Sequence, residues 1–181
     1  MKKTSILICL LAMLLLLCSC AEEPVTTQPS DPVFGDFTAV DLNGNSVDQT
    51  VFEDHKLTMV NIWATFCSPC INEMPALAEL NTAYGDDFQI VGIVLDATDQ
   101  NGNVYPDKKA DAESIIQTTG ADYRHLLPSP ALISAQLGEI QSVPQTVFVD
   151  AEGTQVGVTY AGARSKAQWQ AIIESLLEEV G

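Results

Sequence analysis

One short stretch, residues 60–75, constrains this chain more than any other. It reads Val-Asn-Ile-Trp-Ala-Thr-Phe-Cys-Ser-Pro-Cys-Ile-Asn-Glu-Met-Pro: an apolar strand, a turn with two cysteines and the start of a helix. Two thiols separated by two residues at a helix start can close and reopen a small disulfide ring with little backbone movement. The partial positive charge of the helix N-terminus also favours the thiolate form of Cys67, which is the form that attacks disulfides. The stretch therefore predicts thiol-disulfide chemistry at Cys67 and Cys70.

A Cys-x-x-Cys pair can also be half of a zinc site. A structural zinc needs four ligands. After Cys70 the chain has no further cysteine and one histidine, His125. This inventory argues against zinc, and we expect neither a bound metal nor a cofactor.

The first 20 residues have the pattern of an export signal. A basic start is followed by an apolar run, Ile6 to Leu17, that is too short to span a bilayer comfortably. Leu17-Cys18-Ser19-Cys20 resembles the bacterial lipobox, which implies cleavage before Cys20 and a diacylglyceryl thioether on that cysteine; Cys18 is a poorer alternative because the bulky Leu17 precedes it. An ordinary secreted protein is the other interpretation.

These observations predict three parts of the chain. Residues 1–19 would be a lipoprotein signal peptide, and 34–181 one folded domain. Residues 20–33 are rich in Pro, Thr, Ser and acidic residues without an apolar period, which predicts a flexible tether from lipidated Cys20. The protein would then be an extracytoplasmic, membrane-anchored lipoprotein of a bacterium.

The division into leader, tether and folded domain limits which disulfides the chain can form and what its charge can bind. Only Cys67 and Cys70 remain in the folded part, so a structural disulfide framework is impossible. The leader holds two of the eight basic residues and none of the 24 acidic ones, so the mature chain carries a formal charge of −18. This balance argues against nucleic acid and against adhesion to anionic lipid by charge, so the acyl group must supply attachment. The acidity fits simple solubility or a preference for basic partners.

Hydrophobic periodicity predicts an α/β order of elements along residues 34–181. A hairpin around Asn43-Gly44 comes first, and a capping box at Ser165 and Gln168 starts the last helix. Pro75 should kink the helix in which it lies. The expected strands are 37–42, 46–47, 57–63, 88–95, 123–127, 142–150 and 154–160; the expected helices follow Cys70 and cover 110–119, 130–137 and 166–180, and 96–109 is expected to be a polar loop.

The order of elements is that of the thioredoxin fold, and particular residues make the resemblance more specific. Trp63 to Cys70, then Glu73 and Pro75, then Val143-Pro144-Gln145-Thr146 before an apolar strand resemble the TlpA/ResA group of membrane-anchored thiol-disulfide oxidoreductases. Asn61 also fits this group. The resemblance covers about residues 33–181. It implies an α/β, thioredoxin-like fold with a central mixed sheet flanked by helices, an N-terminal β-hairpin and an inserted strand and helix between Asp96 and Leu127.

Roles for the cysteines follow from their places in the turn. Cys67, nearer the helix start and more exposed, is expected to be the nucleophile, and Cys70 then resolves the mixed disulfide. The resemblance further implies that Glu73 faces the pair and manages the proton on Cys70. The alternative for Glu73 is a solvated helix residue.

The other site residues are also implied by the resemblance. Pro144 would be in the cis form, with the Val143 backbone pairing with an extended substrate strand. Pro69 shapes the turn, although it could simply be a first-turn helix proline. Phe66 replaces the tryptophan common in the group and would keep an aromatic lid over the site. Asp96 follows the predicted strand 88–95 and is interpreted as a strand-end cap, with a place near the site as the alternative. His55 and His125 are interpreted as surface or packing residues, and Trp63 as core.

The group also suggests partners. Clients would be disulfide-containing exported proteins, with apocytochrome c as one possibility, and electrons would come from a membrane donor of the CcdA/DsbD type to a monomeric reductase. Two other functions were weighed. A Cu(I)-binding dithiol chaperone leaves Pro69 and Pro144 without a purpose. A peroxiredoxin-like peroxide reductase fits poorly, because Thr65 lies two residues before Cys67 instead of three.

Overall fold

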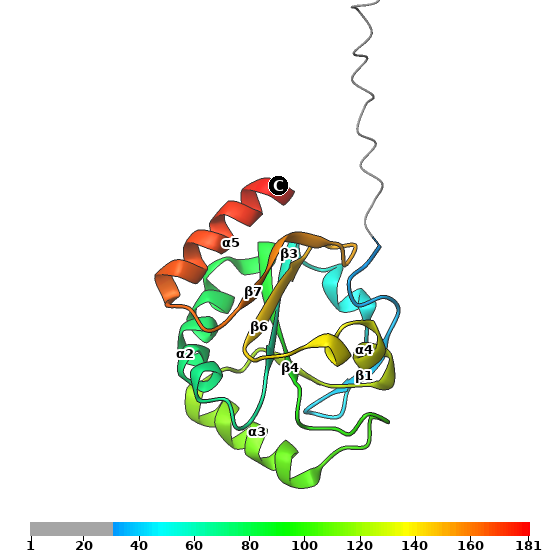
Figure 1. Cartoon of the computed structure of the whole chain (residues 1–181). Coiled ribbons are helices and arrows are strands. Elements are labelled where there is room, and N and C mark those ends of the chain that lie inside the picture. The colour runs from blue at the N-terminus through cyan, green and yellow to red at the C-terminus, as the bar shows by residue number, and fades with distance from the viewer. Residues whose placement is uncertain (1–30) are drawn as a thin grey trace, which may run out of the picture.

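The computed structural model describes residues 31–181, so the predicted signal peptide, Cys20 and most of the predicted tether lie outside the described residues. This part of the chain forms one seven-stranded sheet between two helical layers (Figure 1). Helices α2, α3 and α5 cover one face, and α4 with the 3-10 helix η1 covers the other (Figure 1). The strands are β1 Thr38–Asp41, β2 Ser46–Asp48, β3 Leu57–Trp63, β4 Phe88–Val94, β5 Arg124–Leu127, β6 Gln145–Val149 and β7 Gln155–Ala161. The helices are α2 Ser68–Ala83, α3 Pro106–Thr119, α4 Pro130–Ala135 and α5 Lys166–Val180, with 3-10 helices η1 Gln49–Phe52, η2 Gly85–Asp87 and η3 Leu137–Glu139.

The sheet is mixed, as predicted, with the order β2-β1-β5-β4-β3-β6-β7. Strands β3, β4 and β5 run parallel, while β1 and β6 run antiparallel to their neighbours. All residues of β3 are buried, because both faces of a central strand are covered by helices and only a continuous apolar run satisfies this position. The carboxyl end of β3 therefore delivers the cysteine turn to the middle of one edge of the sheet.

Helix α2 begins directly after this turn, for reasons visible in the sequence. Cys67 is its N-cap residue, and Pro69 occupies the first turn, where its missing N–H costs no hydrogen bond. The helix continues through Pro75, which is exposed. The predicted kink at Pro75 stays a prediction.

The inserted segment after β4 differs from the prediction at its boundaries. Residues 96–109 were expected to be a loop, but α3 already begins at Pro106. The first turn of α3 is polar and exposed, so it has no apolar period, and the proline at its start was the available signal. Helix α4 is likewise shorter than predicted: it ends at Ala135, and Leu137 belongs to η3.

Three tight turns have the same construction: one joins β1 to β2, one joins β6 to β7, and one lies in the insert between β4 and α3. In each, one aspartate Oδ1 accepts the backbone N–H groups two and four residues further on, and the glycine three residues after the aspartate has φ between 79° and 86°. A carboxylate thus closes the turn, and glycine supplies the left-handed conformation. The aspartates are Asp41, Asp99 and Asp150. The first turn confirms the predicted N-terminal hairpin.

Candidate functional site

The two cysteines lie at the N-terminus of α2 and are bonded to each other, with S–S 2.04 Å and Cα–Cα 5.3 Å. The Cys70 N–H donates a hydrogen bond to Sγ of Cys67 at 3.2 Å, so the first sulfur lies at the unpaired amides of the helix. Cys67 is 5% exposed and Cys70 1% exposed. Cys67 is thus the more accessible sulfur, as predicted, by a small margin.

The turn before Cys67 is held from the neighbouring strand. Asp96, at the end of β4, accepts the Thr65 N–H at 3.0 Å and the Thr65 hydroxyl at 2.6 Å. Lys108 of α3 donates to the same hydroxyl at 3.4 Å. Asp96 therefore binds the turn that leads to Cys67 and lies near the site, and the Lys108 contact shows that the insert supports this turn.

Glu73 is buried, so the interpretation of a solvated helix residue is wrong. Its carboxylate accepts three hydrogen bonds: from Asn61 Nδ2 at 3.3 Å, from the Arg164 backbone N–H at 3.0 Å and from Trp169 Nε1 at 3.0 Å. Burial raises the pKa of Glu73 above its usual value, and the three hydrogen bonds and the charge of Arg164 oppose this only in part. Glu73 therefore favours the protonated form more than a surface glutamate does.

The Val143–Pro144 peptide bond is cis, as the resemblance implied. Strand β6 begins at the next residue, Gln145, which pairs with Ile62 near the end of β3. This register places Pro144 at the level where the chain leaves β3 for the cysteine turn. Val143 is half-buried and packs on the cores of both faces.

A loop that sequence analysis did not single out, Gly162–Arg164, joins these parts. The Gly162 N–H donates to the Pro144 carbonyl oxygen at 2.9 Å, and the Arg164 N–H donates to Glu73. Trp169, whose indole N–H also donates to Glu73, lies on α5 just after this loop. The capping box at Ser165, which is present, marked the end of this loop but gave no sign of its partners.

The surface around the disulfide is partly apolar. Phe66 is 72% exposed, and Pro69 is also exposed. Pro69 lines a shallow depression together with Asn72, Glu73, Ala163 and Arg164. Phe66 is therefore an exposed aromatic residue directly before Cys67 in the chain, and its predicted role as a lid stays a prediction.

Both histidines lie away from the disulfide. His125 is buried, accepts the Trp63 indole N–H at 3.2 Å through Nδ1 and contacts the Ala121 carbonyl oxygen at 2.9 Å through Nε2. Burial lowers its pKa to about 4. These contacts confirm His125 and Trp63 as packing residues of the core.

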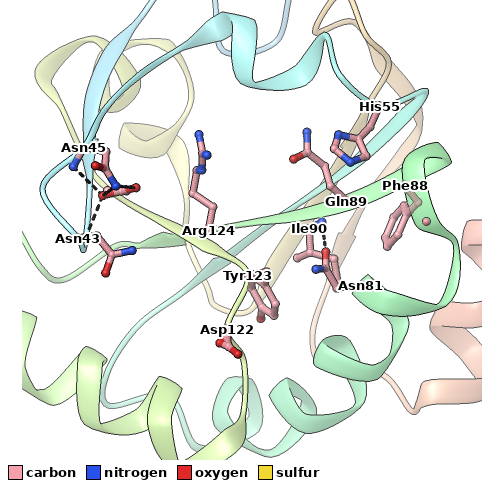
Figure 2. A pocket seen from close by; sticks show the side chains of 12 residues that line it. Asn43, Asn45, His55, Asn81, Phe88, Gln89, Ile90, Asp122, Tyr123 and Arg124 are labelled. Atoms are coloured by element: carbon pink, nitrogen blue, oxygen red, sulfur yellow. Dashed lines mark hydrogen bonds between the residues drawn. The ribbon is translucent and has the colours of Figure 1, made fainter.

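A second, polar hollow of about 430 Å³ includes His55 and lies where β4 and β5 begin. Figure 2 shows Arg124 in its middle, with Asn45 on one side and Gln89 and His55 on the other. Because β3 and β4 are parallel, this hollow is at the opposite edge of the sheet from the cysteines. Within residues 31–181 no group of three or more His, Cys, Asp and Glu side chains could hold a metal ion, and no helix in this range is long and apolar enough to cross a membrane.

Comparison with known proteins agrees with this geometry. Residues 28–171 match the Redoxin protein family. The chain belongs to this family. It is 27% identical over 128 residues to the thiol:disulfide interchange protein DsbE of Yersinia pestis, which covers 70% of this chain and 60% of that protein. It is 34% identical over 64 residues to the thiol-disulfide oxidoreductase ResA of Bacillus thuringiensis subsp. konkukian, covering 35% of this chain and 36% of that protein.

A solved structure shows the same fold. The thiol:disulfide interchange protein of Chlorobium tepidum TLS matches with a TM-score of 0.65 and 26% identity, over 83% of this chain and 97% of that one. The predicted thioredoxin-like fold of the TlpA/ResA type is thereby confirmed, and thiol-disulfide exchange is the class of chemistry at the bonded pair. The chain spans less than two thirds of the Yersinia protein and of the Bacillus protein.

Proposed function

We propose that this protein is an extracytoplasmic, lipid-anchored thiol-disulfide oxidoreductase that reduces disulfides in exported proteins. The observation that carries the proposal is the bonded pair itself: Cys67 is the N-cap of α2, its sulfur accepts a helix N–H, and a cis proline loop adjoins the turn. The remaining steps follow from what each group can do chemically.

Reduction of a client proceeds in two exchanges, starting from the dithiol. The Cys67 thiolate attacks one sulfur of the client disulfide, forms a mixed disulfide and releases the other client sulfur as a thiolate. Cys70, as thiolate, then attacks Cys67, closes the Cys67–Cys70 disulfide and releases the second client sulfur. Two electrons pass to the client, and the protein ends oxidised. The helix N-terminus favours the first exchange because it raises the fraction of Cys67 that is present as the attacking thiolate.

Glu73 would manage the proton on Cys70. It follows Cys70 by one turn on the same helix, so both side chains project to the same side. Because burial raises its pKa, Glu73 can take up and return a proton closer to neutral pH than an exposed glutamate. A charged Glu73 would also keep Cys70 protonated until Cys67 has reacted.

The client would bind as an extended segment beside the Val143–Pro144 loop. The free backbone groups of Val143 suit pairing with such a strand, and exposed Phe66 and Pro69 offer apolar contacts for its side chains. None of these contacts selects a particular sequence, which fits a range of exported proteins, with apocytochrome c as one possible client.

Attachment through Cys20 would place the disulfide away from the lipid. The Val33 N–H donates to the Gly153 carbonyl oxygen at 2.9 Å, and Gly153 follows β6 at the end of the sheet where β3 begins. Cys67 follows the other end of β3, about 23 Å away for seven strand residues at 3.3 Å each. To react with a membrane donor of the CcdA/DsbD type, the domain would then have to rotate so that its disulfide faces the lipid. The chain from Cys20 to Asp31, which would permit this rotation, can span at most ~40 Å.

The test is the equilibrium potential of the Cys67–Cys70 pair against glutathione, with insulin reduction as the assay. We expect a potential near that of thioredoxin, about −270 mV; one near that of DsbA, about −120 mV, would overturn the reducing direction. Cys67→Ser should abolish insulin reduction, and Cys70→Ser should accumulate mixed disulfides. If both variants behave as the wild type does, the pair is not the catalyst.

A further inference from the structure

Two basic side chains stand out because neither forms an ion pair within 4 Å, although the charge of Arg124 acts on Asp41 and that of Arg164 acts on Glu73. Residues 31–181 contain six basic residues, and four of these have a carboxylate within 4 Å: Lys56 with Asp87, Lys108 with Asp111, Lys109 with Glu113 and Lys166 with Glu79. Within this range Arg124 and Arg164 have none. Arg124 lies in the hollow of Figure 2, at the edge of the sheet far from the disulfide. Arg164 lies beside the helix that carries the cysteines.

The Arg164 side chain is held in place although it lacks an ionic partner. Its guanidinium carbon lies 4.9 Å from the ring centres of both Tyr160 and Trp169, and Nη1 donates to the carbonyl oxygens of Ala161 at 3.3 Å and Gly162 at 2.8 Å. Among the described residues, no hydrogen bond uses Nε or Nη2 of Arg164. A fixed cation with a free pair of donors is preorganised for a bidentate acceptor, because little side-chain entropy remains to be lost.

Arg164 lies next to the place where we propose that the client binds. It lines the shallow depression with Pro69 and Asn72 of α2, and its loop bonds both Glu73 and the Pro144 carbonyl oxygen. The depression includes Pro69 of the cysteine turn, and the loop of Arg164 is bonded to the Pro144 carbonyl oxygen, so it adjoins both places where we propose that the client is held. Asn72 is exposed and offers a second polar group there.

We propose that Arg164 is a specificity-determining residue, which binds the carboxylate of an aspartate or glutamate close to the reactive cysteine of the client. This inference rests on the proposed function and names the client class more closely. A carboxylate matches the fork of the guanidinium in shape and charge. With a formal charge of −18, the mature chain repels acidic segments in general, so a local cation at the docking edge is the means of accepting them.

The experiment compares disulfide-linked peptide dimers that differ in one residue. The reference dimer has glutamine at each of the four positions within two residues of its cysteine, and each test dimer replaces one glutamine by glutamate. Single-turnover reduction by the pre-reduced protein is followed at low ionic strength, and each rate is divided by the rate of the same dimer with dithiothreitol. We expect a preference of about fivefold for glutamate at one position or more, which falls in 0.5 M salt.

Arg164→Gln should abolish this preference, and Arg164→Lys should keep part of it, because the charge remains while the fork is lost. Arg124→Gln removes the other unpaired cation and is the matched control, so it should keep the full preference. Because the reduction rates of two dimers are compared within each variant, a general loss of activity cancels from their ratio. Equal rates for all dimers with the wild type, or equal loss in Arg124→Gln, would overturn the inference alone. Failure of the wild type to reduce any dimer would overturn the proposed function instead.

Discussion

Two buried titratable side chains, Glu73 and His125, lie over the same face of the sheet and invite comparison. A single row of paired residues connects them: Thr146 of β6 pairs with Asn61, Asn61 with Gly92 and Gly92 with His125. Asn61 donates to Glu73 at one end of the row, and the His125 ring lies over Gly92 at the other. Burial acts on both in the same way, since it disfavours the charged form, raising the pKa of Glu73 and lowering that of His125 to about 4.

What differs is the surroundings. Glu73 is on the cysteine helix and lines a depression with Pro69, whereas His125 lines a hollow with Tyr123 and packs against Trp63. The same electrostatic effect therefore accompanies two roles: under the proposed function Glu73 exchanges a proton with Cys70, and His125 is a neutral ring that packs the core. A shifted pKa in this fold therefore indicates burial alone. A catalytic role also requires that the group can exchange a proton with a cysteine sulfur.

The largest expected effect concerns Gly92 and His125, at the β5 end of the row. A Cβ on Gly92 would lie 2.1 Å from His125 Nδ1, so Gly92→Ala should destabilise the folded protein by about 3 kcal/mol. His125→Ala removes the ring, and Gly92→Ala should cost at least about 2 kcal/mol less in that background. Urea unfolding of the four proteins of this cycle measures the coupling. Additive effects would show that His125 does not occupy the space over Gly92.

The chemical end of the row should respond differently. Glu73→Gln keeps the shape of the side chain, and its one oxygen can still accept from Arg164 and Trp169. Without a proton to exchange, release of the client by Cys70 should slow by about 100-fold, and the rate should lose the part of its pH dependence that Glu73 causes. Stopped-flow decay of a mixed disulfide with a peptide measures this step. His125→Gln is the control and should decay like the wild type; equal slowing in both variants would remove the distinction.

Glu73 and His125 should also make the free energy of unfolding depend on pH in opposite directions. His125 has a usual pKa of 6.5 and a folded pKa of about 4, so the unfolded chain binds its proton first as the pH falls. Stability is lost as the pH falls from 6.5 towards 4, by about 1.6 kcal/mol between pH 6.5 and 5. The difference in free energy of unfolding between wild type and His125→Gln should shrink by this amount over that range. A difference that does not change with pH would mean that His125 titrates normally in the folded state.

Glu73 acts in the other direction. Its folded pKa is raised above 4.5, so the stability it contributes is complete below pH 4.5 and is lost as the pH rises through the folded pKa. Glu73→Gln should therefore gain stability relative to the wild type as the pH rises. Urea unfolding of this pair at several pH values checks the sign, and a gain on falling pH would contradict the raised pKa.

Much of this fold could be predicted from local sequence. Strand β3 has the predicted bounds, because a central strand needs an unbroken apolar run, and α2 begins where Pro69 and the cysteine turn indicate. The capping box at Ser165 likewise marked the start of α5. The start of α3 was placed four residues too late, because its first turn is polar on all sides and periodicity has nothing to detect there.

The site was predictable in its sequential part and, through the family resemblance, in the cis peptide bond before Pro144. Cys67, Cys70 and Glu73 are close in sequence, and a Cys-x-x-Cys pair at a helix start predicts thiol-disulfide chemistry. The partners of Glu73 are not local: Arg164 is 91 residues away and Trp169 is 96 residues away, and packing of α5 on α2 brings them there. Trp63 and His125 are separated by 62 residues, so no spacing rule could pair them. Contacts of this kind depend on sheet order and helix packing, which a single sequence does not display.

The smallest effect concerns the residue at the outer end of the row. Thr146 accepts a hydrogen bond from Asn61 Nδ2 at 3.2 Å, while the same nitrogen donates to Glu73 at 3.3 Å. Thr146→Val keeps the volume but removes this acceptor, so the Asn61 amide retains Glu73 as its partner and the protein should lose about 1 kcal/mol. If Asn61 positions Glu73, client release should also slow slightly in this variant, whereas Thr58→Val, at a buried site far from Glu73, should lower stability alone. Urea unfolding and mixed-disulfide decay of both variants separate these outcomes, and identical decay rates would show that the row only supports the fold.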